Sequence, residues 1–148
     1  RGDKVYNFSA EDINGEIFIL DSLDREGLVV IDFWAVMCRP CVKALNKAEE
    51  LKEIYSDTLT YIAINEDGPV TQRRAENFVK TKGYDFIFLF DEDGKIMRDY
   101  GVITLPAMFI LDDSLRILKV HEGFTPGDEV WFEDFVENYI GQLRKSRK

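Results

Sequence analysis

The sequence predicts an α/β fold, a three-layer α/β/α sandwich with a mixed central sheet and an N-terminal β-hairpin. Short apolar runs of strand length recur along its 148 residues, and they alternate with segments in which apolar residues repeat every three or four positions. The order is strand, helix, strand, helix, then two strands joined by a turn, and a closing helix. Elements in this order pack as a sheet covered by layers of helices.

The first half of the chain contains the hairpin and two central strands. A strand over 16–20 follows Asn14–Gly15, a dipeptide that favours a two-residue hairpin turn. The run 28–34 is almost continuously apolar, which is typical of a strand covered on both faces. Between it and the strand over 59–65, apolar residues recur at helical spacing and predict a helix over 39–55.

The second half contains one more helix followed by three strands. The helix over 69–83 has Pro at its start and Gly at its end, the usual asymmetry of helix termini. A strand over 86–90 comes next, and then a turn and a short connecting segment. The strands over 107–111 and 116–120 are separated by Asp-Asp-Ser-Leu, which suits an antiparallel hairpin.

The closing helix has a start signal and an apolar stripe. Thr125 is the expected N-cap, Pro126 the first helical residue, and Asp128 the side chain that returns to the cap. The residues expected on the inner face of this helix share helical spacing and are Trp131, Phe135, Tyr139 and Leu143.

Composition and length restrict what the molecule can be. We expect one domain over 1–148, because 45% hydrophobic and 13% aromatic residues are ample for a single core. The net charge of −9 argues against nucleic acid as a partner, since phosphates would be repelled. No apolar run approaches the roughly 20 residues that span a bilayer. The chain starts at Arg1 rather than Met, so we expect a processed or trimmed piece without its targeting segment.

The chemistry is concentrated in the motif Cys38-Arg39-Pro40-Cys41, where the central strand gives way to the first long helix. At a helix N-terminus, unpaired backbone N–H groups and the positive end of the helix dipole favour a thiolate over a thiol. The charge of Arg39 should act in the same direction on Cys38. Cys41, one turn further on, should be more buried and less acidic. Pro40 suits the first helical turn and holds the pair rigid.

Two other uses of the cysteine pair fit less well. A four-coordinate zinc site needs two further ligands, and His121 is the single histidine of the sequence. A purely structural disulfide would close a very short loop, and short loops restrict the unfolded chain least. A redox-active dithiol therefore explains the pair best, and it requires no metal or other cofactor.

Asp32 interrupts the apolar strand six residues before Cys38, between neighbours that should be buried. Burial raises the pKa of a carboxyl group, so that Asp32 can accept a proton near neutral pH from beneath the pair. The alternative is a strand-end aspartate that points to solvent or caps a loop.

Pro106 also stands out, because it begins a strand to which it can donate no hydrogen bond.

Together these features resemble the thioredoxin superfamily. Residues 32–41, Asp-Phe-Trp-Ala-Val-Met-Cys-Arg-Pro-Cys, are similar to its active-site stretch. The hairpin around Asn14–Gly15 and the segment 101–111, which contains Thr104-Leu105-Pro106, look more like the TlpA/ResA-like branch of exported thiol–disulfide oxidoreductases. The resemblance extends from about Phe8 to the last helix, and it implies a thioredoxin-like sandwich.

The resemblance implies a role in catalysis for four residues. Cys38 would be the nucleophile and Cys41 the resolving thiol, and Asp32 matches the buried acid that manages the Cys41 proton. Pro106 matches the cis-proline that faces the disulfide, and the backbone of Leu105 would pair with an extended substrate segment. The function implied is exchange of disulfides with protein substrates, as a reductase rather than an oxidant because Asp32 can promote attack by Cys41.

Substrate contacts are expected from two segments that flank the pair. The residues of this expected contact surface are Trp34, Met37, Arg39, Pro40, Thr104 and Leu105. Trp34 matches the tryptophan that packs beside the site in the superfamily. Met37 replaces the usual tryptophan, so this part of the surface should be more apolar and flexible. Ala44 stands where ResA-like members that act in cytochrome maturation carry glutamate, which argues against that specialised role.

Two alternative functions share the fold. A thiol peroxidase of the peroxiredoxin type would need Thr or Ser three residues before the reactive cysteine, where this chain has Ala35. A copper-delivery protein would use a wider cysteine spacing and a histidine, for which His121 is the single candidate.

For the oxidoreductase, the resemblance implies protein partners with disulfides or dithiols and an upstream electron donor. It also implies a monomer and a location outside the cytoplasm, such as the bacterial periplasm.

Overall fold

The computed structural model describes residues 2–146, whereas Arg1, Arg147 and Lys148 of the expected domain lie outside the described part. In that part, seven strands form one sheet in the order β2-β1-β5-β4-β3-β6-β7. The strands are β1 (Ser9–Asp12), β2 (Ile17–Ile19), β3 (Leu28–Trp34), β4 (Leu59–Asn65), β5 (Ile87–Phe90), β6 (Ala107–Leu111) and β7 (Ile117–Glu122). The helices are α1 (Arg39–Tyr55), α2 (Gln72–Lys82), α3 (Lys95–Asp99) and α4 (Asp128–Ser146), with single 3-10 turns at Leu20–Ser22 and Ser56–Thr58.

Strand β3 joins the parallel and antiparallel parts of the sheet. It pairs in parallel with β4 and antiparallel with β6, so that Asp32 lies between Ala63 and Met108. Strand β4 pairs in parallel with β5, whereas β1 and β7 run antiparallel to their neighbours. The sheet is therefore mixed, as predicted, and the predicted hairpin around Asn14–Gly15 joins β1 to β2 at one edge.

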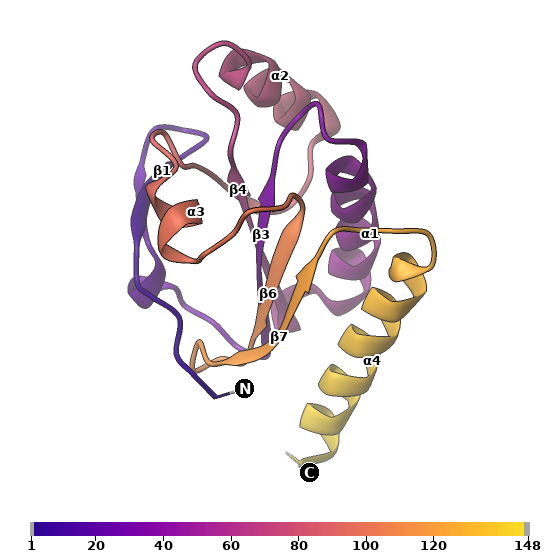
Figure 1. The fold of residues 1–148 in the computed structure, drawn as a ribbon. Helices are drawn as coiled ribbons and strands as arrows, with labels where there is room; N and C mark the ends of the chain where they lie inside the picture. Colours follow the sequence, from indigo (N-terminus) through magenta and orange to yellow (C-terminus); the bar gives the residue numbers. More distant parts are fainter. Residues whose placement is uncertain (1, 147–148) are drawn as a thin grey trace.

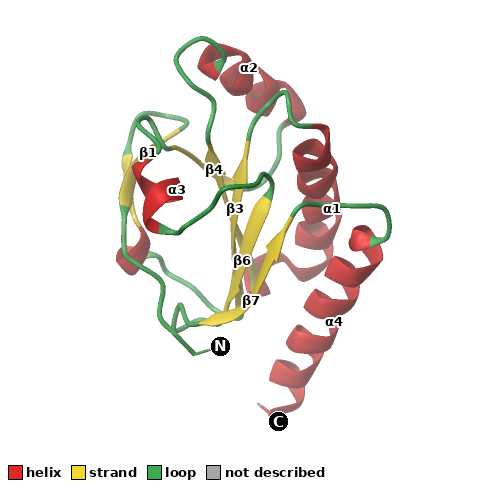
Figure 2. Cartoon of the chain, in the orientation of Figure 1, coloured by secondary structure: helices red, strands yellow, loops and turns green. Residues whose placement is uncertain are grey.

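Helices and the N-terminal segment cover the two faces of the sheet. Helices α1, α2 and α4 pack on one face, over a core that includes Trp34, Leu45 and Phe132. Helix α3 and the N-terminal segment cover the other face, over a core that includes Phe33 and Ile64. Figures 1 and 2 show α1 and α4 together on one side of the central strands and α3 on the other. The arrangement is the three-layer sandwich that the sequence predicts.

The alternation of side chains along β3 determines which core each residue faces. Val30 and Trp34 belong to the core that α1 covers, whereas Ile31 and Phe33 belong to the opposite one. Because successive residues of a strand point to opposite faces, Asp32 faces α1 with Val30 and Trp34. Every residue of β3 is buried, which agrees with its continuous apolar run.

Two expectations about the middle of the chain need correction. Helix α2 begins at Gln72 rather than at Pro69, because the N–H groups of Thr71 and Gln72 bond with the carbonyl of Gly68 in a preceding turn. The connection before Gly101 contains the short helix α3, which the sequence pattern does not predict. The N–H groups of its first turn bond with the Asp91 carboxylate rather than with a residue inside the helix.

The inner face of α4 is also shifted by one residue from the expected stripe. The fully buried side chains are those of Phe132, Val136 and Ile140, whereas Trp131, Phe135 and Tyr139 lie at the margin and are partly buried. The helix begins at Asp128, whose carboxylate accepts a hydrogen bond from the N–H of Thr125 at 2.8 Å. No helix within residues 2–146 is long and apolar enough to cross a membrane.

Candidate active site

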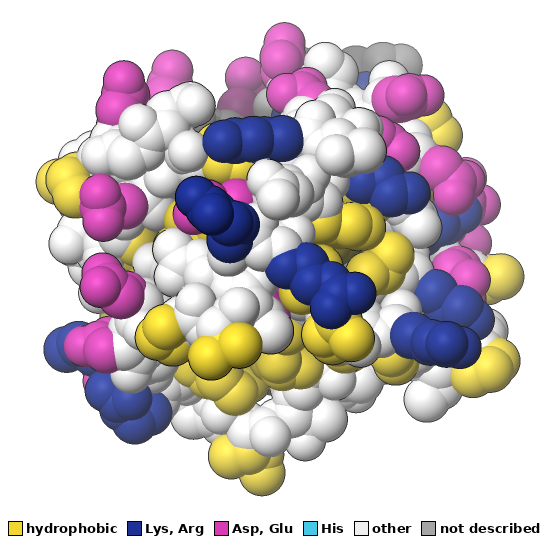
Figure 3. Space-filling view, turned by 90° about the horizontal axis from the view of Figure 1, so that it is seen from above, with side chains coloured by type: hydrophobic (Ala, Val, Ile, Leu, Met, Phe, Trp, Pro, Cys, Tyr) yellow, Lys and Arg dark blue, Asp and Glu magenta, His cyan; other side chains and the backbone are white. Residues whose placement is uncertain are grey.

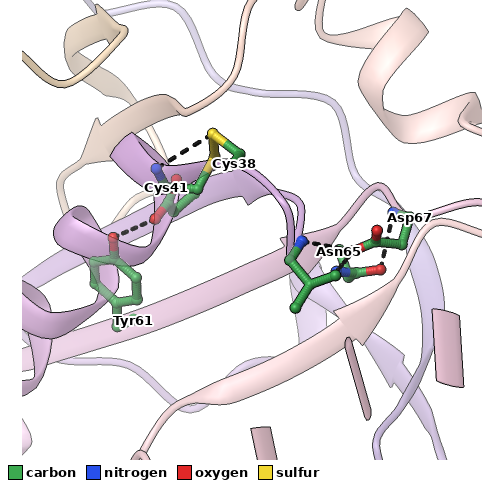
Figure 4. The surroundings of a disulfide bond; sticks show 7 residues. Cys38, Cys41, Tyr61, Asn65 and Asp67 are labelled. Carbon is green, nitrogen blue, oxygen red and sulfur yellow. Dashed lines mark hydrogen bonds between the residues drawn. A yellow bond between two sulfur atoms is a disulfide. The ribbon is translucent and has the colours of Figure 1, made fainter. Parts of the chain in front are cut away.

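The two cysteines lie at the N-terminus of α1, directly after β3 and its short connecting loop (Figure 4). They form a disulfide, with Cα atoms 5.2 Å apart. Cys38 is the N-cap of the helix and is half-buried, whereas Cys41 is fully buried against the core beneath α1. The expected contrast between an accessible first sulfur and a shielded second one is present in this arrangement.

The start of α1 provides a hydrogen-bond donor for the sulfur of Cys38. The backbone N–H of Cys41 donates to the Sγ of Cys38 at 3.3 Å. A sulfur at an N-cap also lies at the positive end of the helix dipole, which favours its anionic form once the disulfide is reduced. Arg39 and Pro40 are the first two helical residues, and both are exposed beside the sulfur. Pro40 has no N–H, so its place in the first turn leaves no donor unpaired.

Asp32 is fully buried, which excludes the alternative of a solvent-facing aspartate. Burial raises the pKa of its carboxyl group to about 7, although a hydrogen bond from the Tyr61 hydroxyl opposes the rise. That hydroxyl donates to Oδ2 at 2.6 Å, whereas Oδ1 has no hydrogen-bond partner among the described residues. A buried carboxyl group with a pKa near 7 can accept and release a proton at neutral pH.

Tyr61 was not identified from the sequence, and it completes the environment of Asp32. It lies on β4, two residues before Ala63, the residue paired with Asp32. It is fully buried in the core that contains Cys41, and the dashed line from its hydroxyl in Figure 4 is the hydrogen bond to Asp32. Burial and the neighbouring Asp32 carboxylate raise the pKa of the Tyr61 hydroxyl well above its usual value. The hydroxyl therefore remains a hydrogen-bond donor to Asp32.

A second missed feature holds the loop that leads to Cys38. The carboxylate of Asp67 accepts hydrogen bonds from the N–H of Val36 at 2.8 Å, the amide of Asn65 at 2.8 Å and the hydroxyl of Thr71 at 2.6 Å. Figure 4 shows Asn65 and Asp67 facing one another where β4 ends. The position of Asp67, just after a strand that neighbours β3, is the sequence signal that could have identified it.

The segment before β6 contributes the expected proline. The peptide bond between Leu105 and Pro106 is cis. Pro106 is buried, and its carbonyl accepts a hydrogen bond from the N–H of Gly123 at 2.7 Å. Leu105 is partly buried and Thr104 is exposed, so the backbone of this segment is accessible at the same end of the sheet as the cysteine pair.

The expected contact surface needs one correction. Trp34 is fully buried, where its ring packs against Phe78 and Phe88, so it supports the site from inside and cannot contact a protein substrate. Met37 is 63% exposed and is the most accessible large apolar side chain of the loop before Cys38. Ala35 accepts a hydrogen bond from the N–H of Cys38 through its carbonyl, but its methyl side chain offers no donor to a peroxide.

Glu66 is a third residue that sequence reasoning missed. It follows β4 and forms a carboxyl pair with Asp91, which follows β5. Burial, and then the neighbouring Asp91 carboxylate, raise the pKa of Glu66 to about 10, so Glu66 is protonated at neutral pH. Glu66 follows Ile64 by two residues and therefore faces α3 rather than the cysteine pair. Glu66 therefore helps to hold α3 in place.

His121, the residue of the copper-delivery alternative, has other partners. Its Nε2 atom lies 3.0 Å from Oδ2 of Asp128, and its ring stacks on Trp131 with centroids 4.4 Å apart. These contacts join the end of β7 to the start of α4. Among residues 2–146, no three His, Cys, Asp or Glu side chains are grouped so as to hold a metal ion.

Comparisons with known sequences agree with this geometry. Residues 1–120 match the profile of the AhpC/TSA family. The thiol–disulfide oxidoreductase ResA of Halalkalibacterium halodurans is 30% identical over 137 residues, which cover 92% of this chain and 75% of the relative. The thioredoxin-like protein YneN of Bacillus subtilis is 32% identical over 125 residues, which cover 83% of this chain and 72% of the relative.

Solved structures give the same result. A DsbE-like thiol:disulfide interchange protein from Chlorobium tepidum superposes with a TM-score of 0.81 at 28% identity, over 90% of this chain and 93% of that chain. StoA from Bacillus subtilis superposes with a TM-score of 0.66 at 25% identity, over 84% of this chain and 93% of that one. The chain therefore belongs to the AhpC/TSA family and, within it, to the ResA-like thiol–disulfide oxidoreductases with a thioredoxin-like fold.

Proposed function

We propose that this oxidoreductase reduces disulfides of partner proteins, with Cys38 as the attacking sulfur and Cys41 as the sulfur that releases the product. The observation that carries the proposal is the contrast at the start of α1. Cys38 is partly exposed, whereas Cys41 is fully buried on the face of the sheet that carries Asp32. A disulfide in another protein can reach only the first of these two sulfurs.

The first step joins the two proteins. The thiolate of Cys38 attacks one sulfur of the partner's disulfide, a bond forms between these two sulfurs, and the partner's S–S bond breaks. The departing sulfur carries away the electron pair and takes a proton from water. The N–H of Cys41 supports the thiolate before the attack. The accessible backbone around Leu105 can hold the partner's chain in an extended form.

The second step releases the partner. Asp32 accepts the proton of the Cys41 thiol, for which a pKa of about 7 is suitable. The resulting thiolate attacks the Cys38 sulfur, the bond between Cys38 and Cys41 forms, and the bond to the partner breaks. The partner's second sulfur leaves with the electron pair of that bond and takes a proton from water, so the partner has gained two electrons and become a dithiol. The oxidoreductase has lost two electrons and is left with a disulfide between Cys38 and Cys41.

A further turnover requires a reductant, and we propose that a dithiol protein acts as the upstream donor. We also propose a location outside the cytoplasm, such as the bacterial periplasm, where disulfides form and persist in partner proteins. The chain would act there as a monomer, because a net charge of −9 disfavours self-association.

Reduction of insulin by dithiothreitol, followed as turbidity, tests the reductase. The protein should accelerate the reaction, and Cys38→Ser should abolish the acceleration. Reduced Cys41→Ser, freed of dithiothreitol and then mixed with insulin, should accumulate a partner bound to Cys38, visible as an added mass that dithiothreitol removes. Full activity in the Cys38→Ser variant would refute the assignment. Consumption of hydrogen peroxide much faster than by free cysteine would favour the thiol peroxidase instead.

A further inference from the structure

A groove of about 440 Å³ opens beside the cysteine pair, between the loop that precedes Cys38 and helix α2. Val36 and Met37 form the loop side, and Phe78 lies on the helix side. Met37 is 63% exposed and directly precedes Cys38, so a chain that lies in this groove reaches the attacking sulfur. The groove is therefore placed to contact residues next to a target cysteine.

The helix that lines this groove is basic on an acidic protein. Four basic side chains of α2 are exposed, namely Arg73, Arg74, Lys80 and Lys82, and Glu76 is the single acidic residue of the helix. The whole chain has a net charge of −9. Figure 3, which views the molecule from above α2, shows Lys and Arg side chains among apolar ones in the middle of this face and most acidic side chains toward its rim.

Two of these cations lie in the groove itself. Arg74 and Lys82 belong to its lining, and the ammonium group of Lys82 lies 5.8 Å from the centre of the Phe78 ring. The cation thus stands at the margin of an apolar floor formed by Phe78 and Met37. A floor of this kind suits an apolar side chain, and the two cations suit carboxylates on either side of it.

We propose that this groove binds an acidic segment of the partner protein, adjacent to the cysteine that Cys38 attacks. An apolar side chain of the segment lies on Met37 and Phe78, and its carboxylates face Arg74 and Lys82. The proposal rests on the proposed function, since the groove matters only if Cys38 exchanges disulfides with proteins. The net charge of −9 repels an acidic partner from the molecule as a whole, so the basic side chains of α2 favour its approach on the side of the active site.

Three synthetic peptides test this proposal. Each contains one internal disulfide, one leucine and three variable positions next to the target cysteine, filled with Glu, Gln or Lys. The fully reduced protein is mixed with each peptide at low salt, and acid-quenched samples give the second-order rate of peptide reduction. Each rate is divided by the rate of dithiothreitol with the same peptide, because flanking charges alter the reactivity of the disulfide itself.

The Glu peptide should react roughly three- to tenfold faster than the Gln peptide, as expected for two exposed ion pairs, and the Lys peptide should react more slowly. The preference should vanish at 0.5 M salt, since exposed charges are then screened. Arg74→Gln with Lys82→Gln should remove most of the preference for the Glu over the Gln peptide, and the remainder is the contribution of the exposed Arg39 beside Cys38. Arg144→Gln with Lys145→Gln is the matched control at the distant end of α4, and it should keep the ratio.

Equal normalised rates for the three peptides would overturn the proposal and leave the disulfide exchange itself intact. The proposal also fails if the Arg74 and Lys82 variant keeps the full preference, because the selection would then lie elsewhere. If no peptide is reduced at any salt concentration, the proposed function fails and the groove proposal fails with it.

Discussion

At the scale of single residues, Asp32 is the group whose chemistry depends most on the fold. Its carboxyl group is fully buried, and its pKa is raised from 3.8 to about 7. Below pH 4 the group is protonated in both the folded and the unfolded chain. Between pH 4 and 7 the folded protein keeps a proton that the unfolded chain releases, so the free energy of unfolding falls as the pH rises.

Asp32→Asn should therefore stabilise the oxidised protein at pH 8 by about 4 kcal/mol, because the cost of a buried charge is removed. At pH 4 the two proteins should have nearly equal free energies of unfolding. Urea denaturation at both pH values measures the difference. A variant that is no more stable than the parent at pH 8 would contradict the raised pKa.

Tyr61 sets how far that pKa rises. Its hydroxyl stabilises the carboxylate form of Asp32 through a hydrogen bond of 2.6 Å. Tyr61→Phe removes this donor with little change in volume, so the pKa of Asp32 should rise further and the attack of Cys41 should shift to higher pH. The carboxyl carbon of Asp32, followed by NMR as a function of pH, reports the first effect directly.

The matched control for Tyr61 is Tyr84→Phe. Tyr84 lies in the same core, and its hydroxyl donates to Asn46 at 2.5 Å, away from Asp32. This variant should lose a hydrogen bond without moving the titration of Asp32. If both variants shift the titration equally, a general loosening of the core is responsible and the specific role of Tyr61 is wrong.

At the scale of elements, Asp67 fixes the loop between β3 and α1 to the start of the segment that leads into α2. Its carboxylate accepts hydrogen bonds from Val36, Asn65 and Thr71, and it is almost fully buried. Asp67→Ala should lower the free energy of unfolding by about 3 kcal/mol, because one buried donor and two partly buried donors lose their acceptor. Thr71→Ala removes one of the three donors and should cost about 1 kcal/mol. Urea unfolding of both variants measures these losses, and equal losses would contradict the account.

The sequence predicts the elements around the site well because their patterns are local. Strands β3, β4 and β6 and helix α1 have the predicted bounds, since continuous apolar runs and a clear helical period delimit them. Helix α3 has five residues, too few to show a period, and the carboxylate that caps its first turn is that of Asp91, which lies before the helix. The prediction for the face of α4 is wrong because apolar residues occur on two adjacent stripes, and only packing decides which of them is buried.

The parts of the candidate site that depend on spacing along the sequence could be predicted. The parts that depend on the register between neighbouring strands could not. Cys38, Cys41 and Asp32 are close in the sequence, so their relation follows from a strand that leads into a helix. The contact between Tyr61 and Asp32 requires the register that places Ala63 opposite Asp32, and no local pattern specifies that register. Burial of Trp34 likewise follows from its packing on Phe78 and Phe88, which are distant in the sequence.

At the scale of the whole molecule, the sheet brings three separate segments to one end. The loop after β3 carries Cys38, the segment after β4 carries Asp67, and the segment before β6 carries Pro106. Strands β3 and β4 end there because they are parallel, and β6 begins there because it is antiparallel to β3. One end of the central strands thus holds a nucleophile, its supporting loop and the segment that contains the cis-proline.

The reduction potential of the Cys38–Cys41 couple, equilibrated against dithiothreitol and glutathione buffers, tests the reductase most directly. Asp32 can carry a negative charge on the buried face of β3 that shares its core with Cys41, which disfavours a thiolate there and so favours the disulfide form of this protein. We therefore expect a value near the roughly −270 mV of a protein reductase. A value near the roughly −120 mV of a strong protein oxidant would mean that the start of α1 stabilises the dithiol more than Asp32 opposes it, and the protein would then donate disulfides.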